Sequence, residues 1–97
     1  MVAINWTDEA EVWLKEIHNY IVVDSKPMAS KIVNDIYNRT QVLITFPKIG
    51  YKYQSYEDND IRILLYGHYR IAYVIKDSST IDILGVFHGS LDIERYL

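Results

Sequence analysis

The first half of the chain repeats apolar residues at intervals of three and four, the period of an amphipathic helix. One helix is predicted from Thr7 to about Val23, with Thr7 as its N-cap and acidic residues in its first turn. A second is predicted over Lys26–Ile44, with Pro27 in its first turn and Pro47 beyond its end. The two apolar stripes are Ala10, Trp13, Leu14, Ile17, Tyr20 and Ile21, and Ala29, Ile32, Val33, Ile36, Tyr37 and Leu43.

Strand-forming residues dominate the remainder of the chain, in short runs separated by polar turns. Neither helix can bury its stripe alone, so the helical hairpin is expected to cover a sheet. The predicted fold is α+β: an N-terminal strand and a helical hairpin packed on a mostly antiparallel sheet of four to five strands. A short last helix is predicted from Ser90 to Tyr96. The predicted strands are Val2–Trp6, Tyr51–Tyr56, Ile61–Tyr66, Tyr69–Lys76 and Thr80–Phe87.

The size and composition of the chain indicate one small domain over residues 1–97. It has no cysteine, which excludes disulfides and thiolate chemistry and is compatible with the cytoplasm. The first residues lack the basic and apolar regions of a signal peptide, and no apolar run is long enough to span a membrane. The three histidines have no ligand spacing, so neither a metal nor another cofactor is expected.

The net charge of −3 sets a limit on nucleic-acid binding. From Lys48 onward the chain holds six Lys and Arg against seven Asp and Glu, so this half is not basic overall. Proteins that bind nucleic acids gain much of their affinity by neutralising phosphates. A nucleic-acid site in this protein must therefore be local.

Two residues of the predicted C-terminal hairpin are not explained by core packing. If Lys76 pairs with Thr80, Arg70 lies opposite Val86, and Arg70 and His88 become diagonal neighbours on one face, roughly 7–8 Å apart. At that spacing both side chains can act on one phosphate, whereas a one-residue slip would separate them. The alternative for Arg70 is a solvated side chain, or one paired with an acid such as Asp82.

Several motifs together resemble the RelE/ParE superfamily of bacterial toxins. They are the strand ending at Trp6, two amphipathic helices, the Pro47-x-x-Gly50 loop, the Tyr69-Arg70-Ile71-x-Tyr73 strand and the terminal Val86-Phe87-His88-Gly89. The resemblance spans nearly the whole chain. Within this superfamily, one scaffold supports two activities: ribosome-dependent cleavage of messenger RNA, and inhibition of DNA gyrase without cleavage.

The resemblance also implies roles for individual residues. In an RNA-cleaving member, Arg70 would stabilise the charge on the phosphate and His88 would protonate the leaving oxygen, with Arg62 as a third catalytic candidate. Candidate substrate-binding residues are Lys52, Arg95 and Tyr96. Many members carry an arginine just after the His-Gly pair, where this chain has Ser90-Leu91-Asp92.

These considerations predict the toxin of a type II toxin–antitoxin module, bound and masked by a cognate antitoxin. Between the two activities, the Arg70 and His88 pair favours cleavage of messenger RNA on the ribosome by a narrow margin. Inhibition of DNA gyrase is the close alternative, in which no enzyme activity is needed. A third possibility is an inactive member that only binds its antitoxin and thereby regulates transcription.

Overall fold

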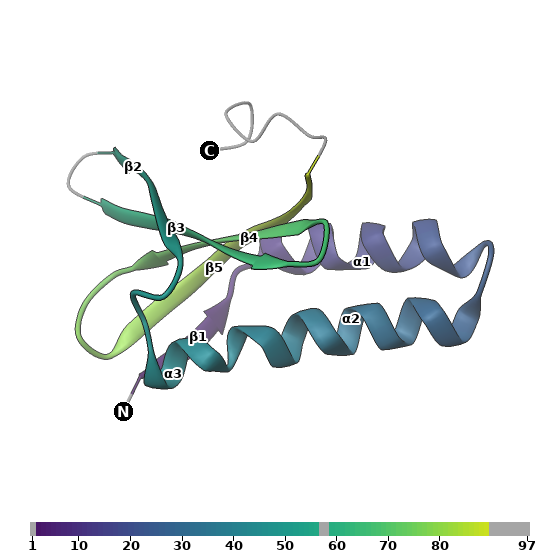
Figure 1. Ribbon diagram of the computed structural model, residues 1–97, viewed down its shortest axis with the longest axis horizontal. Coiled ribbons are helices and arrows are strands. Elements are labelled where there is room, and N and C mark those ends of the chain that lie inside the picture. The colour runs from purple at the N-terminus through teal and green to yellow at the C-terminus, as the bar shows by residue number, and fades with distance from the viewer. Residues whose placement is uncertain (1, 57–58, 90–97) are drawn as a thin grey trace.

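The structure is a computed structural model that describes residues 2–56 and 59–89 of the chain. Within these residues a single sheet has the strand order β1-β5-β4-β3-β2, with β1 parallel to β5 and every other pair antiparallel (Figure 1). The α+β prediction is confirmed. In chain order the elements are β1 (Ala3–Trp6), α1 (Asp8–Val22), α2 (Lys26–Thr40), α3 (Val42–Thr45), β2 (Tyr51–Tyr56), β3 (Asn59–Tyr66), β4 (Tyr69–Ile75) and β5 (Thr80–His88).

Local sequence signals account for the helix starts. The Thr7 hydroxyl accepts a hydrogen bond from the Ala10 amide, and the Ser25 hydroxyl accepts one from the Met28 amide. The predicted second helix, however, is two helices, because α2 ends at Thr40 and α3 begins at Val42. The Thr40 hydroxyl bonds the Tyr37 carbonyl, and the Gln41 amide bonds the Asn38 carbonyl, which tightens the last turn.

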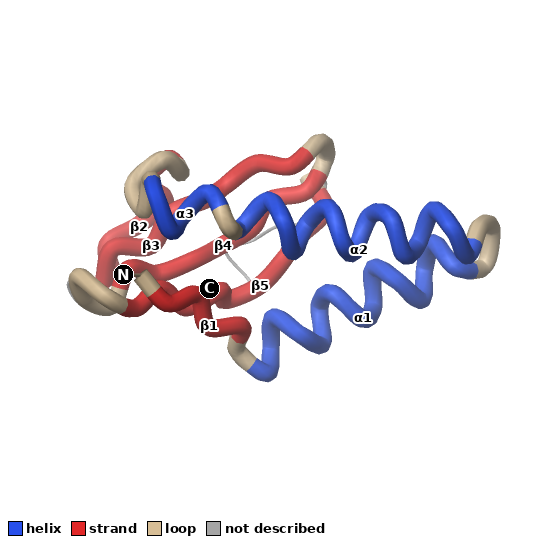
Figure 2. The backbone as a smooth tube through the Cα atoms, turned by 90° about the horizontal axis from the view of Figure 1, so that it is seen from below, coloured by secondary structure: helices blue, strands red, loops and turns tan. Residues whose placement is uncertain are grey.

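The helices lie on one face of the sheet, and their connecting turn projects beyond it (Figures 1 and 2). The main core lies between these layers and includes Ile36, Leu43, Ile71, Tyr73 and Val86. A smaller cluster of Ile63, Ala72 and Phe87 occupies the opposite face of the sheet. Tyr20 belongs to the predicted apolar stripe but is 82% exposed, because it lies near the projecting end of the helical hairpin.

The register of the C-terminal hairpin differs from the prediction. Near the turn the pairing is as expected, since the Lys76 amide bonds the Thr80 carbonyl. A bulge then shifts β5 by one residue between Ala72 and Tyr73, so that Arg70 pairs with Phe87 rather than Val86. Gly85 fits this bend because a Cβ there would lie 2.6 Å from the Phe87 ring.

Candidate functional site

The shifted register places the Arg70 and His88 side chains on opposite faces of the sheet. His88 pairs with Tyr69, and Arg70 pairs with Phe87. Paired residues point to the same face and successive residues alternate, so His88 faces the helices with Val86 while Arg70 faces away from them. The predicted juxtaposition of the two side chains is therefore wrong, because of the one-residue slip that the bulge introduces.

Arg70 is held against the end of β5. Its Nη2 donates a hydrogen bond to the Gly89 carbonyl at 3.2 Å, and its Nε is buried. The predicted alternative partner, Asp82, instead contacts Lys76 Nζ at 3.2 Å and the Asn5 amide group at 3.1 Å. Arg70 thus ties the β5 terminus to β4, and Asp82 ties β5 to β1.

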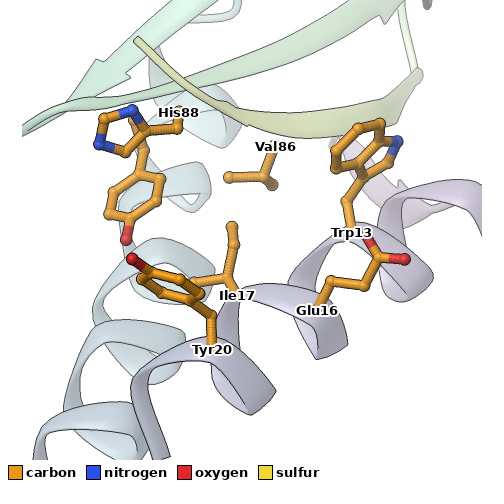
Figure 3. Close-up of a pocket in the computed structure, with 7 residues that line it drawn as sticks. Trp13, Glu16, Ile17, Tyr20, Val86 and His88 are labelled. Atoms are coloured by element: carbon orange, nitrogen blue, oxygen red, sulfur yellow. The ribbon is translucent and has the colours of Figure 1, made fainter. Parts of the chain in front are cut away.

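His88 lies at the rim of a groove between α1 and the terminal half of β5. Its ring meets the Tyr69 ring edge-on, with centroids 5.7 Å apart, and lies 6.3 Å from the stacked His68 ring. Figure 3 shows Val86 and His88 descending from β5 and the side chains of α1 rising opposite them. The groove has a volume of about 420 Å³ and is lined by Trp13, Glu16, Ile17, Tyr20, Tyr69, Val86 and His88.

The chemistry of this groove is that of a docking site for an amphipathic segment. Its walls are mainly aromatic and aliphatic, and Trp13 closes one end by packing edge-on against Phe87 at a centroid distance of 4.7 Å. Glu16 supplies a carboxylate among these apolar groups. Apolar grooves with a few placed polar groups bind ligands or peptide segments.

Arg62 holds the loop that precedes β2. Its Nη1 donates to the carbonyls of Lys48 and Gly50 at 3.2 and 3.0 Å, and its Nε donates to the Asp60 carboxylate at 3.1 Å. Only 17% of its side chain is exposed. The donors of this predicted catalytic residue are directed at the loop, which gives Arg62 a structural role in the fold.

Tyr73 holds the same loop from beneath. Its hydroxyl donates to the Pro47 carbonyl at 2.8 Å and accepts a hydrogen bond from the Gly50 amide at 3.0 Å. Burial raises the pKa of the Tyr73 phenol above its usual value. A Cβ at Gly50 would lie 2.7 Å from both the Ile63 carbonyl oxygen and the Tyr73 hydroxyl, so no larger residue fits without a shift.

Of the three predicted substrate-binding residues, Lys52 alone lies among the described residues. Lys52 is exposed on β2, directly opposite Arg62. Arg95, Tyr96 and the predicted helix Ser90–Tyr96 lie outside the described residues. The structure thus brings Arg62 and Lys52 together at one edge of the sheet, with His88 at the far end of β5.

Two features of the site were missed by sequence reasoning. The Tyr73 hydroxyl appeared only as part of an apolar strand pattern, because its partners lie in a loop more than twenty residues away. The position of the groove, between α1 and the end of β5, was also missed, because the antitoxin was predicted only to lie along a groove beside the helices or the sheet. An aromatic stripe on a helix that outreaches its sheet is a signal for this position. Tyr20, near the end of that stripe, was expected in the core.

The described residues contain neither a metal-binding cluster nor a membrane-spanning helix. No group of three or more His, Cys, Asp or Glu side chains is arranged there to hold a metal ion. Over the same ranges, no helix has the length and apolar character needed to cross a bilayer.

Comparisons with known proteins agree with the fold. A structure of the chromosomal ParDE toxin–antitoxin system from P. aeruginosa contains a similar chain, with 25% identity and a TM-score of 0.74 over 91% of this chain and 96% of that one. No curated protein matches the sequence. The family model of the ParE toxin of the type II toxin–antitoxin system parDE matches residues 4–93. The chain therefore belongs to the ParE toxin family of type II toxin–antitoxin systems.

Proposed function

We propose that this protein is a toxin that inhibits DNA gyrase and does not cleave messenger RNA. The observation that carries the proposal is the match of residues 4–93 to the ParE family, since gyrase inhibition is the activity that the superfamily resemblance associates with ParE. An acidic chain with a net charge of −3 is also better suited to a protein target than to a ribosome.

The arrangement of the cleavage candidates supports the same choice. Metal-independent cleavage needs a phosphate-stabilising cation and a proton donor at one phosphate. Arg70 and His88 point to opposite faces of the sheet, and the Arg62 guanidinium is engaged by loop carbonyls and Asp60. Under gyrase inhibition these residues serve the fold or contact a partner, and no catalytic group is required.

The cognate antitoxin is proposed to occupy the groove between α1 and β5. A flexible antitoxin segment can gain its fold on binding by burying apolar side chains against Trp13, Ile17 and Tyr20. A basic residue of the segment would face Glu16. Such a complex would form in the cytoplasm, where gyrase acts.

The two activities are separated by induced expression in a bacterial host, with thymidine and methionine incorporation followed in parallel. Early loss of thymidine incorporation, with filamentous cells, is expected from gyrase inhibition. Early loss of methionine incorporation alone would contradict the proposal and point to messenger RNA cleavage. No effect on either would identify an inactive member that only binds its antitoxin.

A further inference from the structure

The loop before β2 exposes two large apolar side chains near the end of the sheet that lies away from the groove. Phe46 is 58% exposed and Ile49 is 49% exposed. They line a shallow hollow of about 520 Å³ together with Thr45, Pro47 and Lys48. Grouped exposed apolar side chains rimmed by polar ones are typical of protein-binding surfaces.

This loop is fixed from below, which separates it from an ordinary surface loop. Tyr73 holds Pro47 and Gly50, and Arg62 holds the carbonyls of Lys48 and Gly50. The backbone that carries Phe46 and Ile49 is thereby positioned before any partner arrives. Preorganisation lowers the entropy cost of association, so the two side chains are suited to act as anchors.

The exposed lysines of this region carry the charge opposite to that of α1 beside the groove, with Asp60 paired to Arg62 and Asp77 lying near Lys48. Lys48 and Lys52 are both exposed, and both adjoin Arg62: Arg62 bonds the Lys48 carbonyl and pairs across the sheet with Lys52. We call Phe46, Lys48, Ile49 and Lys52 the loop patch. In contrast, α1 beside the groove contains four acidic residues against one lysine, Lys15.

This charge pattern selects among possible occupants. In a symmetric pair of copies, the same patch would face itself and bring the lysines of both copies together, which is unfavourable. An acidic and partly apolar protein surface complements the loop patch. The antitoxin is proposed to bind elsewhere, in the groove around Glu16.

We infer that the loop patch is the surface by which this toxin contacts an acidic, partly apolar surface of DNA gyrase. The inference rests on the proposed function and extends it by assigning target and antitoxin to separate surfaces near opposite ends of the sheet. Phe46 and Ile49 provide the buried anchors, and Lys48 and Lys52 orient the encounter.

The test is a supercoiling assay with purified gyrase and purified toxin, using two double variants: Lys48→Glu with Lys52→Glu, and Phe46→Ser with Ile49→Ser. All four positions are exposed, so both variants are expected to fold. Each is expected to need at least about tenfold more toxin for half-inhibition than the wild type. Their affinity for the cognate antitoxin is expected to be unchanged.

A matched control is Lys15→Glu with Lys26→Glu, which changes the net charge equally at exposed positions on the helices. It is expected to inhibit gyrase as the wild type does. Wild-type inhibition by both loop-patch variants would overturn the inference, as would an equal loss in the control or a parallel loss of antitoxin binding. If the wild-type toxin itself leaves supercoiling unchanged, the proposed function fails, and the inference fails with it.

Discussion

The groove and the loop patch present apolar side chains in physically different ways. At the groove, Tyr20 and its neighbours extend from a helix past the end of the sheet, and Tyr20 is 82% exposed. At the loop patch, buried polar groups of Tyr73 and Arg62 fix the backbone that carries the exposed residues. Mutations under the loop should therefore destabilise the whole fold, whereas a mutation of the exposed Tyr20 at the groove should affect binding alone.

The largest effect is expected from Gly50→Ala. The new Cβ would meet the Ile63 carbonyl and the Tyr73 hydroxyl at 2.7 Å, and a backbone oxygen cannot move aside cheaply. We expect a loss of about 3 kcal/mol in the free energy of unfolding, measured by urea denaturation. Gly67→Ala is the control: its φ of 54° makes alanine unfavourable by about 1 kcal/mol, but nothing lies within 4 Å. Equal losses in both variants would contradict the close packing of the loop.

A smaller loss is expected from Tyr73→Phe, which leaves the Pro47 carbonyl and the Gly50 amide without their partner. Two such groups at a buried site cost about 2 kcal/mol of unfolding free energy. Tyr37→Phe, at an exposed position on α2, should stay within about 0.5 kcal/mol of the wild type. A neutral Tyr73→Phe would show that the hydroxyl does not hold the loop.

The pH dependence of stability provides a second measurement on Tyr73. Because burial raises the pKa of its phenol, the folded chain keeps the proton at a pH where the unfolded chain releases it. The contribution is fully present below the unfolded value of 10.0 and is lost as the pH rises toward the folded pKa. As the pH rises above 10.0, Tyr73→Phe should therefore lose less unfolding free energy than the wild type, as measured by urea denaturation.

At the groove, Tyr20→Ser should act on binding and leave the fold intact. The side chain is largely exposed, so the free energy of unfolding should change by less than about 0.5 kcal/mol. The dissociation constant for the antitoxin should rise about tenfold, as measured by calorimetry. Val23→Ser, also on the projecting end but not lining the groove, should bind normally. If Tyr20→Ser binds the antitoxin with the affinity of the wild type, the antitoxin does not occupy this groove.

The smallest effect is expected from Asp35→Asn. Asp35 lies on α2 and lines neither the groove nor the hollow at the loop patch. Hydrogen bonds from Lys31 at 2.9 Å and the Tyr66 hydroxyl at 2.8 Å lower the pKa of the Asp35 carboxyl. A lowered pKa contributes stability above the unfolded value of 3.8 that is lost as the pH falls through the folded pKa. In Asp35→Asn, the free energy of unfolding should therefore fall slightly less steeply than in the wild type as the pH drops through this range. Parallel profiles for the variant and the wild type would contradict this expectation.

Local signals in the sequence were sufficient to predict most of the helices and strands and the protein family. Thr7 caps its helix through an atom three residues away, and the strand pattern placed Tyr69–Ile75 correctly to within one residue. The register was not predictable in the same way. It depends on the bulge beside Gly85 and on the Phe87 ring that packs over it, and neither is encoded in the alternation of apolar and polar residues.

The candidate site shows the same division between local and long-range information. Arg62 and Lys52 were found as charged strand residues, but the partners that engage Arg62 lie across a loop. The separation of Arg70 from His88 follows from the bulge alone. The sequence-based preference for messenger RNA cleavage depended on their predicted proximity and is not confirmed, and gyrase inhibition fits the ParE family better.

The central claim is tested most directly by titrating purified toxin into a gyrase supercoiling reaction, with and without its antitoxin. We expect supercoiling to be lost as toxin is added and to be restored by stoichiometric antitoxin. Full supercoiling at every toxin concentration, together with cleavage of messenger RNA on translating ribosomes by the same preparation, would contradict it.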